Sequence, residues 1–360
     1  MPRVRTLVLS DLHLGSAGGV DVLRRPAALA ALLGALAGTD RLVLLGDVLE
    51  LRQGPVADAL AAAQPVLAAL GEAMAGREVV VVAGNHDHAL VAPHSEDRGR
   101  ALGLDETIEP AAASPLAAAV AAALAPARVT VAYPGLWLAE GVYATHGHYL
   151  DLHGTVPAYE RLSAGVLARL LGGPPAVGAV PGDYEAVLAP IYALLGAVAA
   201  RASPGRPVRG AGAAGRTWRA MTREGPRPWR AHAAAAAFPL AVRALNRAGV
   251  GPLRADLSGA ALRRGGLHGI REAAARLDVG ARAIVFGHTH RPGPLPGDDP
   301  AEWAGLWNTG SWVLDRHFTA GGARSPYWPG TAIEVDSGGA PRLRRLLDDV
   351  DPGVLSPRRG

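Results

Sequence analysis

Three mainly apolar runs, each followed directly by a polar motif, constrain the fold of this chain most. The runs span residues 4–9, 42–45 and 79–83. Between them, residues 27–36 and 56–74 are rich in Ala and Leu and have the composition of helices. Strands that are apolar throughout are covered on both faces of their sheet. The alternation of such strands with helices therefore predicts an α/β fold.

The remaining chain supplies further predicted strands. Residues 129–133 and 141–145 form a strand pair, and residues 281–286 form the next clear strand. Closing strands are expected at 305–308, 331–335 and 342–346. Residues 88–127 contain charged turns and several prolines, and we interpret them as a connecting excursion.

Five polar motifs stand at the ends of these runs and bring together side chains that bind metal ions. They are Asp11-Leu-His13, Gly46-Asp47, Gly84-Asn85-His86-Asp87, His146-Gly-His148 and Gly287-His288-Thr-His290. Ligands of open α/β sheets lie beyond the carboxyl ends of the strands, so the first three motifs are expected at one rim. Together the motifs offer carboxylate, amide oxygen and imidazole. This mixture suits two divalent metal ions and the hydrolysis of phosphate esters.

Each motif alone has a simpler explanation. Asp47 could cap a helix, Asn85 could be a turn residue, and paired histidines could be solvated in loops. Only the joint occurrence, at five strand ends in one order, favours a two-metal site.

Composition restricts the cell compartment and the partners. The chain lacks Cys, which fits a reducing compartment, and no secretory signal is visible, so a cytoplasmic location is expected. All 36 basic residues are Arg, the net charge is +4, and no basic run exceeds two residues, so nucleic acid is an unlikely partner. The uncharged stretch 186–200 is 15 residues long, which predicts a buried or interfacial helix rather than a membrane span.

A long connection separates the fourth and fifth motifs. The 138 residues from 149 to 286 exceed any ordinary loop and are mostly rich in Ala and Leu. We expect them to contain a helical cap over the site, which could touch a membrane from one side. No obligate protein partner is evident.

The five motifs closely resemble those of the calcineurin-like metallophosphoesterase family, whose pattern is D-x-H, G-D, G-N-H-D, H and G-H-x-H. The resemblance covers residues 1 to about 150 and about 280 to 335. It implies an α/β fold, a four-layer sandwich of two mixed β-sheets flanked by helices, with an inserted helical cap. The expected divisions are a core of residues 1–154 and 268–350, a cap of residues 155–267 and a tail of residues 351–360.

The resemblance also implies the ligands of two divalent metal ions, with manganese expected and iron or zinc as alternatives. Asp47 would bridge the two ions, and a water held between them, with its pKa lowered, would be the nucleophile. The other ligands would come from all five motifs: Asp11, His13 and His290 for one ion, and Asn85, His146 and His288 for the other.

Four more residues receive roles at the rim. By the resemblance, His86 would hydrogen-bond the phosphoryl or leaving-group oxygen, and Asp87 would orient its imidazole. His148 would either support a ligand or touch the substrate. Arg291, which follows His290 directly, is a candidate to bind a phosphate through its guanidinium.

A narrower comparison concerns Asp11-Leu-His13-Leu-Gly15 and Gly46-Asp47-Val-Leu-Glu50-Leu51. These segments look like the branch that includes the UDP-2,3-diacylglucosamine pyrophosphohydrolases, whose helical cap holds acyl chains. That branch commonly has Arg where this chain has His86, and Asp where it has His148.

The expected function is therefore a dinuclear metal-dependent phosphoester hydrolase, acting on a lipid-linked or nucleotide-linked small molecule. One alternative is a nuclease-type phosphodiesterase of the same family, which would use the Arg-rich segment 201–230 with Trp218 and Trp229. Another is a binding protein that keeps the fold without turnover.

Overall fold

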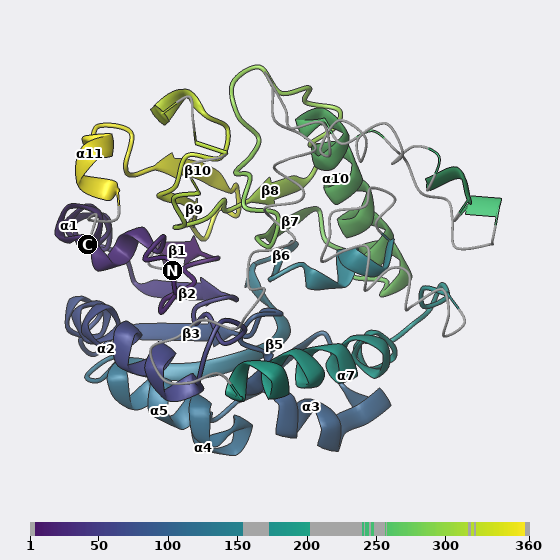
Figure 1. Cartoon of the computed structure of the whole chain (residues 1–360), viewed down its shortest axis with the longest axis horizontal. Helices are drawn as coiled ribbons and strands as arrows, with labels where there is room; N and C mark the ends of the chain where they lie inside the picture. Colours follow the sequence, from purple (N-terminus) through teal and green to yellow (C-terminus); the bar gives the residue numbers. More distant parts are fainter. Residues whose placement is uncertain are drawn as a thin grey trace.

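The computed structural model describes residues 4–153, 173–201, 240, 242–244, 246–247, 256, 258–315, 318–319 and 322–356. Over these residues the fold is mixed α/β, as predicted (Figure 1). All nine predicted strands and both predicted amino-terminal helices are present. The strands are β1 (Thr6–Leu9), β2 (Arg41–Leu45), β3 (Glu78–Val82), β4 (Asp105–Ile108), β5 (Arg128–Ala139), β6 (Val142–Thr145), β7 (Ala283–Phe286), β8 (Leu306–Asn308), β9 (Thr331–Val335) and β10 (Arg342–Arg345).

The ten strands within the described residues form one mixed sheet that nearly closes into a barrel. Its order is β10-β9-β1-β2-β3-β5-β6-β7-β8, with β4 paired to β5. Neighbours from β1 to β5 are parallel, as are β6, β7 and β8. The carboxyl ends of these strands therefore carry the five motifs.

The sequence analysis expected two facing sheets, whereas the structure has a continuous one. The reason is β5, which is 12 residues long instead of the five expected. Its first half pairs with β3 and its second half with β6, so the backbone ladder is never interrupted. Side chains from both halves of the sheet, among them Val43, Leu136 and Val285, form one buried cluster.

Helices cover the outer surfaces of the sheet (Figure 1). A large apolar cluster joins α1, α2 and α5 to β1, β2 and β3, while α10 packs on β7. The expected excursion at 88–127 contains short helices and β4, which the sequence analysis missed because Asp105–Ile108 lacks an apolar pattern.

The helices are η1 (Val22–Arg24), α1 (Pro26–Ala35), α2 (Val56–Ala73), η2 (His88–Leu90), α3 (Ala92–Arg98), η3 (Gly99–Ala101), α4 (Pro110–Ala113), α5 (Pro115–Ala123), η4 (His148–His153), α7 (Pro181–Ala200), α10 (Gly259–Arg276), η5 (Gly322–Arg324) and α11 (Pro352–Leu355).

Part of the expected cap, residues 155–267, lies outside the described residues. Of its Arg-rich segment 201–230, only residue 201 is described. Its described part consists mainly of α7 and the start of α10. The helix expected near 186–200 is present but longer, because it begins at Pro181. By length and composition alone, both α7 and α2 could cross a membrane. However, α7 packs Tyr184 and Leu188 against Leu152 of η4, so its amino-terminal half is part of the protein interior.

Candidate metal centre

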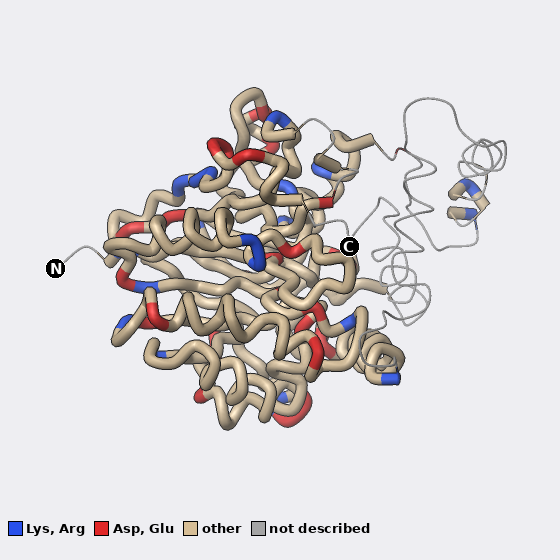
Figure 2. The backbone as a smooth tube through the Cα atoms, turned by 60° about the vertical axis from the view of Figure 1, so that its left-hand side comes forward, with Lys and Arg blue, Asp and Glu red and all other residues tan. Residues whose placement is uncertain are grey.

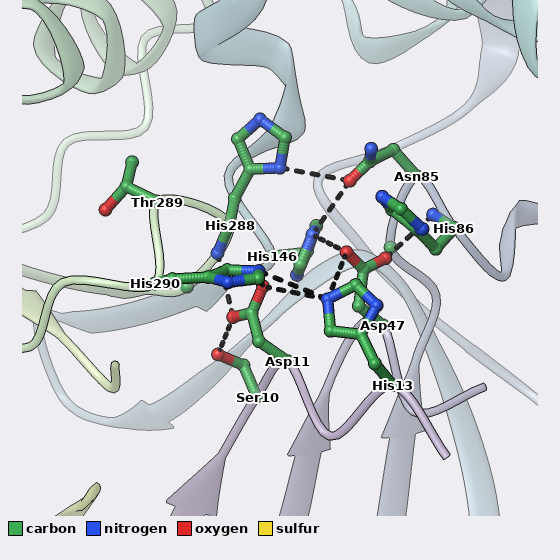
Figure 3. A network of polar contacts seen from close by, with 12 residues as sticks. Ser10, Asp11, His13, Asp47, Asn85, His86, His146, His288, Thr289 and His290 are labelled. Carbon is green, nitrogen blue, oxygen red and sulfur yellow. Dashed lines mark hydrogen bonds and ion pairs between the residues drawn. The ribbon is translucent and has the colours of Figure 1, made fainter. Parts of the chain in front are cut away.

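All five motifs meet at the carboxyl edge of the sheet (Figure 3). Backbone hydrogen bonds fix the loops after β1 and β2 to one another. The Asp11 N–H donates to the Gly46 carbonyl over 3.0 Å, and the His13 N–H donates to the Asp47 carbonyl over 2.8 Å. The convergence expected from the strand order is therefore confirmed.

Five of the predicted ligands have a left-handed backbone, which L-residues seldom adopt. Their φ angles are 54° at Asp11, 45° at His13, 52° at Asp47, 64° at His288 and 60° at His290. Asp and His tolerate this region better than most residues do. Such conformations gather at functional sites, where the surrounding structure holds them. Here they turn the side chains of three loops toward a common centre.

The first group of candidate ligands consists of Asp11, His13 and His290. Nε2 of His13 and Nε2 of His290 face each other at 3.1 Å, and the latter lies 3.1 Å from Oδ1 of Asp11. Among the described residues this buried Oδ1 lacks a hydrogen-bond partner. An unpartnered carboxylate oxygen beside two imidazole nitrogens has the chemistry of a divalent metal site.

The second group consists of Asp47, His146 and His288, with Asn85 beside them. Oδ1 of Asn85 lies 3.1 Å from Nε2 of His146 and 3.0 Å from Nδ1 of His288. Three atoms that carry lone pairs thus point at one another. Metal–ligand bonds of about 2.1 Å place adjacent ligand atoms about 3.0–3.4 Å apart. The spacing of both groups therefore fits two divalent ions.

Asp47, a member of the second group, also lies close to the first group. Its Oδ2 is 3.3 Å from Nε2 of His146 and 3.6 Å from Nε2 of His13. One carboxylate thus contacts a candidate ligand of each ion, which is the position that a bridging ligand requires. This is the placement that the resemblance implied.

The metal centre depends on close packing around its loops. A Cβ atom at Gly84 would overlap the carboxylate of Asp47, and one at Gly287 would overlap Asp11 and Ser10. Glycine at these two positions is thus required by space. Behind the ligands, Asp151 contacts Nε2 of His288 at 2.9 Å and so orients its ring. Sequence reasoning missed Asp151, since it lies in η4 outside any motif.

Burial and charge act in opposite directions on the ligands. Burial alone would raise the pKa of Asp47, but the imidazoles of His146 and His86 hold that pKa well below its usual range. Burial alone would lower the pKa of His146, yet Asp47 raises it to about 9. The Asp47 carboxylate is therefore charged, and without metal the His146 imidazole retains its proton. Metal binding would displace that proton.

Comparison with known proteins identifies the chemistry of this centre. The family model of the calcineurin-like phosphoesterases matches residues 4–165, which contain four of the five motifs. Over these residues the chain is similar to the calcineurin-like phosphoesterases, and its two ligand groups are consistent with a metal-dependent phosphoesterase. No curated protein matches it.

His86 has a different partner from the one expected. Its Nδ1 lies 3.0 Å from both carboxylate oxygens of Glu50, a buried residue that also lies 3.2 Å from Nδ1 of His13. Asp87, which was expected to orient His86, accepts backbone N–H groups of Gly84 and of residues 47–49 instead. Asp87 therefore shapes the loops, and Glu50 holds the imidazole. The sequence signal was the position of Glu50 three residues after Asp47.

His148 lies behind the metal centre and is buried. Its Nε2 is 3.4 Å from the Tyr133 hydroxyl and 4.0 Å from Glu185 of α7. Burial lowers its pKa to about 4, so the imidazole is neutral at neutral pH. Of the two expected roles, the structure places His148 as a support and not against the substrate.

Glu185 is a second residue that sequence reasoning missed. This buried carboxylate of α7 contacts Nε2 of His88 at 2.7 Å. It also accepts hydrogen bonds of 2.6 Å from the hydroxyls of Tyr133 and Tyr149. The loops that carry Asn85 and His146 are thus tied to α7 through one side chain.

Arg291, the candidate for phosphate binding, is engaged within the protein. The residue is 8% exposed, and its guanidinium makes a bidentate ion pair with Asp298, at 3.0 and 2.7 Å. It also lies over the ring of Trp303. The donors that would bind a phosphate are therefore occupied within the protein.

We expect Arg291→Met to lower thermal stability and to leave KM almost unchanged. The substitution keeps the aliphatic packing on Trp303 but leaves the Asp298 carboxylate without its cation. Thermal unfolding and steady-state kinetics with nitrophenyl phosphate would measure the two effects. A rise in KM of tenfold or more at unchanged stability would restore the phosphate-binding role.

Proposed function

We propose that this protein is a dinuclear hydrolase of small phosphoesters that carry a lipid or a nucleotide. The position of Asp47 between the two ligand groups carries the proposal, since a carboxylate in contact with both groups can bridge a pair of ions. Two bound divalent ions would supply Lewis acidity for activating water and neutralising phosphoryl charge.

The residues of the chain have separable tasks in this proposal. Asp11, His13 and His290 would hold one ion, Asn85, His146 and His288 would hold the other, and Asp47 would be shared between them. His86 donates a proton or a hydrogen bond to the leaving-group oxygen. Glu50 keeps the His86 ring in place and stabilises its charged form. The buried floor of the site, formed by the sheet, excludes bulk water from below.

An apolar substituent on the substrate is favoured by the surface of α7. Leu194, Leu195 and Val198 are exposed, with exposed fractions of 64%, 38% and 45%. They follow Tyr192, whose ring lies under the guanidinium of Arg52 close to Asn85. An acyl group attached to a phosphoester at the metal centre could thus reach apolar surface. We extend the proposal to a cytoplasmic enzyme that touches membranes through this end of α7.

Two finer alternatives have less support. In the UDP-2,3-diacylglucosamine pyrophosphohydrolase branch, Arg and Asp commonly stand where this chain has His86 and His148, so we propose only the broader class. A nuclease would need a basic groove, and the Arg-rich segment 201–230 lies outside the described residues, apart from residue 201. Figure 2 shows basic and acidic positions interspersed along the described chain in this view.

The test is a substrate panel with the purified full chain and manganese, iron or zinc. The panel contains a nitrophenyl phosphomonoester, a nitrophenyl phosphodiester, a nucleotide diphosphate sugar and an acylated derivative of each. We expect hydrolysis that a chelator abolishes and a preference for acylated or nucleotide-linked members. A protein that binds two ions but hydrolyses none of the panel would contradict the proposed function. Equal rates with and without acyl groups would contradict only the lipid part.

A further inference from the structure

Tyr192 of α7 lies among the loops that carry the metal ligands. Its ring is 5.2 Å from the ring of His88 and 5.8 Å from that of His148, and the guanidinium carbon of Arg52 is 5.2 Å from its centroid. His88 follows the Asn85 motif, His148 belongs to the His146 motif, and Arg52 follows the Asp47 motif. A helix from the insertion thus places an aromatic side chain against three loops of the core.

The hydroxyl of Tyr192 is buried and has no hydrogen-bond partner among the described residues. An unpaired buried hydroxyl is unfavourable by itself, so such groups call for an explanation. Tyr133 and Tyr149, its neighbours around Glu185, both satisfy their hydroxyls. The hydroxyl of Tyr192 thus differs from those of both neighbouring tyrosines in lacking an acceptor.

Arg52 provides a second donor without a partner at the same place. Its Nε is buried and lacks a hydrogen-bond partner in the described chain, while one terminal nitrogen donates to the Asn85 carbonyl over 2.6 Å. The terminal nitrogens also face the side-chain amide of Asn85. With the amide oxygen turned toward His146 and His288, Arg52 faces the amide nitrogen, which is a donor. An Asn85 that binds metal therefore leaves Arg52 in need of an acceptor.

We propose that the Tyr192 hydroxyl and the Arg52 guanidinium together bind an oxygen of the substrate's phosphoryl group, so that α7 completes the active site. The inference rests on the proposed phosphoesterase function. Two adjacent buried donors beside a metal centre fit an anionic oxygen acceptor better than a neutral group. It also gives the insertion a direct role in recognition, beyond its apolar surface.

The hydroxyl stays a donor over the working pH range. Burial raises the pKa of Tyr192 well above its ordinary value, and the Asp151 carboxylate adds to this effect. A neutral phenol can donate to an oxyanion without adding negative charge to a site that already contains several carboxylates.

The test is Tyr192→Phe, which removes the hydroxyl and keeps the ring on Arg52. We expect unchanged metal content and an unchanged or higher Tm, because the lost group has no partner in the free enzyme. The affinity of the metal-loaded protein for inorganic phosphate, measured by calorimetry, should fall on the order of ten- to a hundredfold. The value of kcat/KM should fall by a similar factor.

Tyr184→Phe is the matched control on the same helix. The Tyr184 hydroxyl is 2.8 Å from Nε2 of His153, and its ring stacks on Tyr149. The same chemical change should therefore lower the Tm and leave phosphate affinity and kcat/KM unchanged.

The outcomes separate the inference from the function on which it rests. If wild type binds phosphate and turns over, while Tyr192→Phe matches it in both, then the inference is wrong and the function stands. A Tyr192→Phe protein with a lower Tm would show that the hydroxyl has a structural partner, which also contradicts the inference. A wild type that neither binds phosphate nor hydrolyses the panel would overturn both.

Discussion

The Asp47→Asn variant should be folded, depleted of metal and several orders of magnitude slower than wild type. Asp47 contacts candidate ligands of both ions, so loss of its charge weakens both sites at once. The fold should tolerate the change for two reasons. Asn adopts the left-handed backbone about as readily as Asp. Its amide oxygen can still accept the backbone N–H of His86, which in wild type lies 2.8 Å from Oδ1 of Asp47.

Elemental analysis, circular dichroism and turnover of a nitrophenyl phosphoester would measure these effects. Asp298→Asn is the matched control, because it makes the same change at an ion pair with Arg291 that lies outside both ligand groups. It should keep both ions and nearly normal rates. An Asp47→Asn protein that retained two ions and wild-type turnover would contradict the bridging role.

The His86→Ala variant should keep both metal ions and lose about 10²–10⁴-fold in rate. Glu50 engages Nδ1 of His86, so we expect Nε2 to be the nitrogen that donates to the leaving-group oxygen. The loss should be smaller for leaving groups that need no proton. A series of aryl phosphoesters with leaving-group pKa values from about 5 to 10 would measure this dependence.

Glu50→Gln serves as the companion variant. The substitution keeps a side chain of the same size beside His86, but it removes the negative charge that stabilises the protonated imidazole. We expect a smaller rate loss with the same dependence on leaving group. If His86→Ala lost the same factor with every ester, the residue would position the phosphoryl group and would not act as a proton donor.

The sequence was sufficient for the strands along the chain and for the first three motifs brought together at the rim. Apolar runs that end in Asp or Asn carry both signals at once, because parallel strands place their carboxyl ends at one edge. Asp11, Asp47 and Asn85 could thus be placed near one another from the sequence alone. The continuity of the sheet could not, since nothing in residues 134–139 indicates that β5 would extend across both halves.

The supporting residues were harder to predict for a different reason. Glu50, Asp151 and Glu185 act through contacts between segments distant in the chain, and an isolated acidic residue in a sequence looks like any solvated one. Asp87 was misassigned because adjacency to His86 suggested contact. In the structure its carboxylate is used by backbone N–H groups of the neighbouring loop. The ion pair of Arg291 was missed as well, although its partner Asp298 lies only seven residues further along.

The left-handed backbone of five ligand residues serves the metal centre but is unfavourable for stability. Each such conformation costs an L-residue about 1 kcal/mol, and glycine adopts it freely. At Asp11, His13, Asp47, His288 and His290, glycine would therefore relieve the backbone while removing a ligand. At Asp11 and Asp47 it would also leave the backbone N–H groups of His288 and His86 without their acceptors. Laboratory evolution that rewarded heat resistance alone would favour glycine wherever the relieved strain exceeds the lost contacts, and it would produce a heat-resistant but inactive protein. Only selection for turnover keeps the five side chains in place.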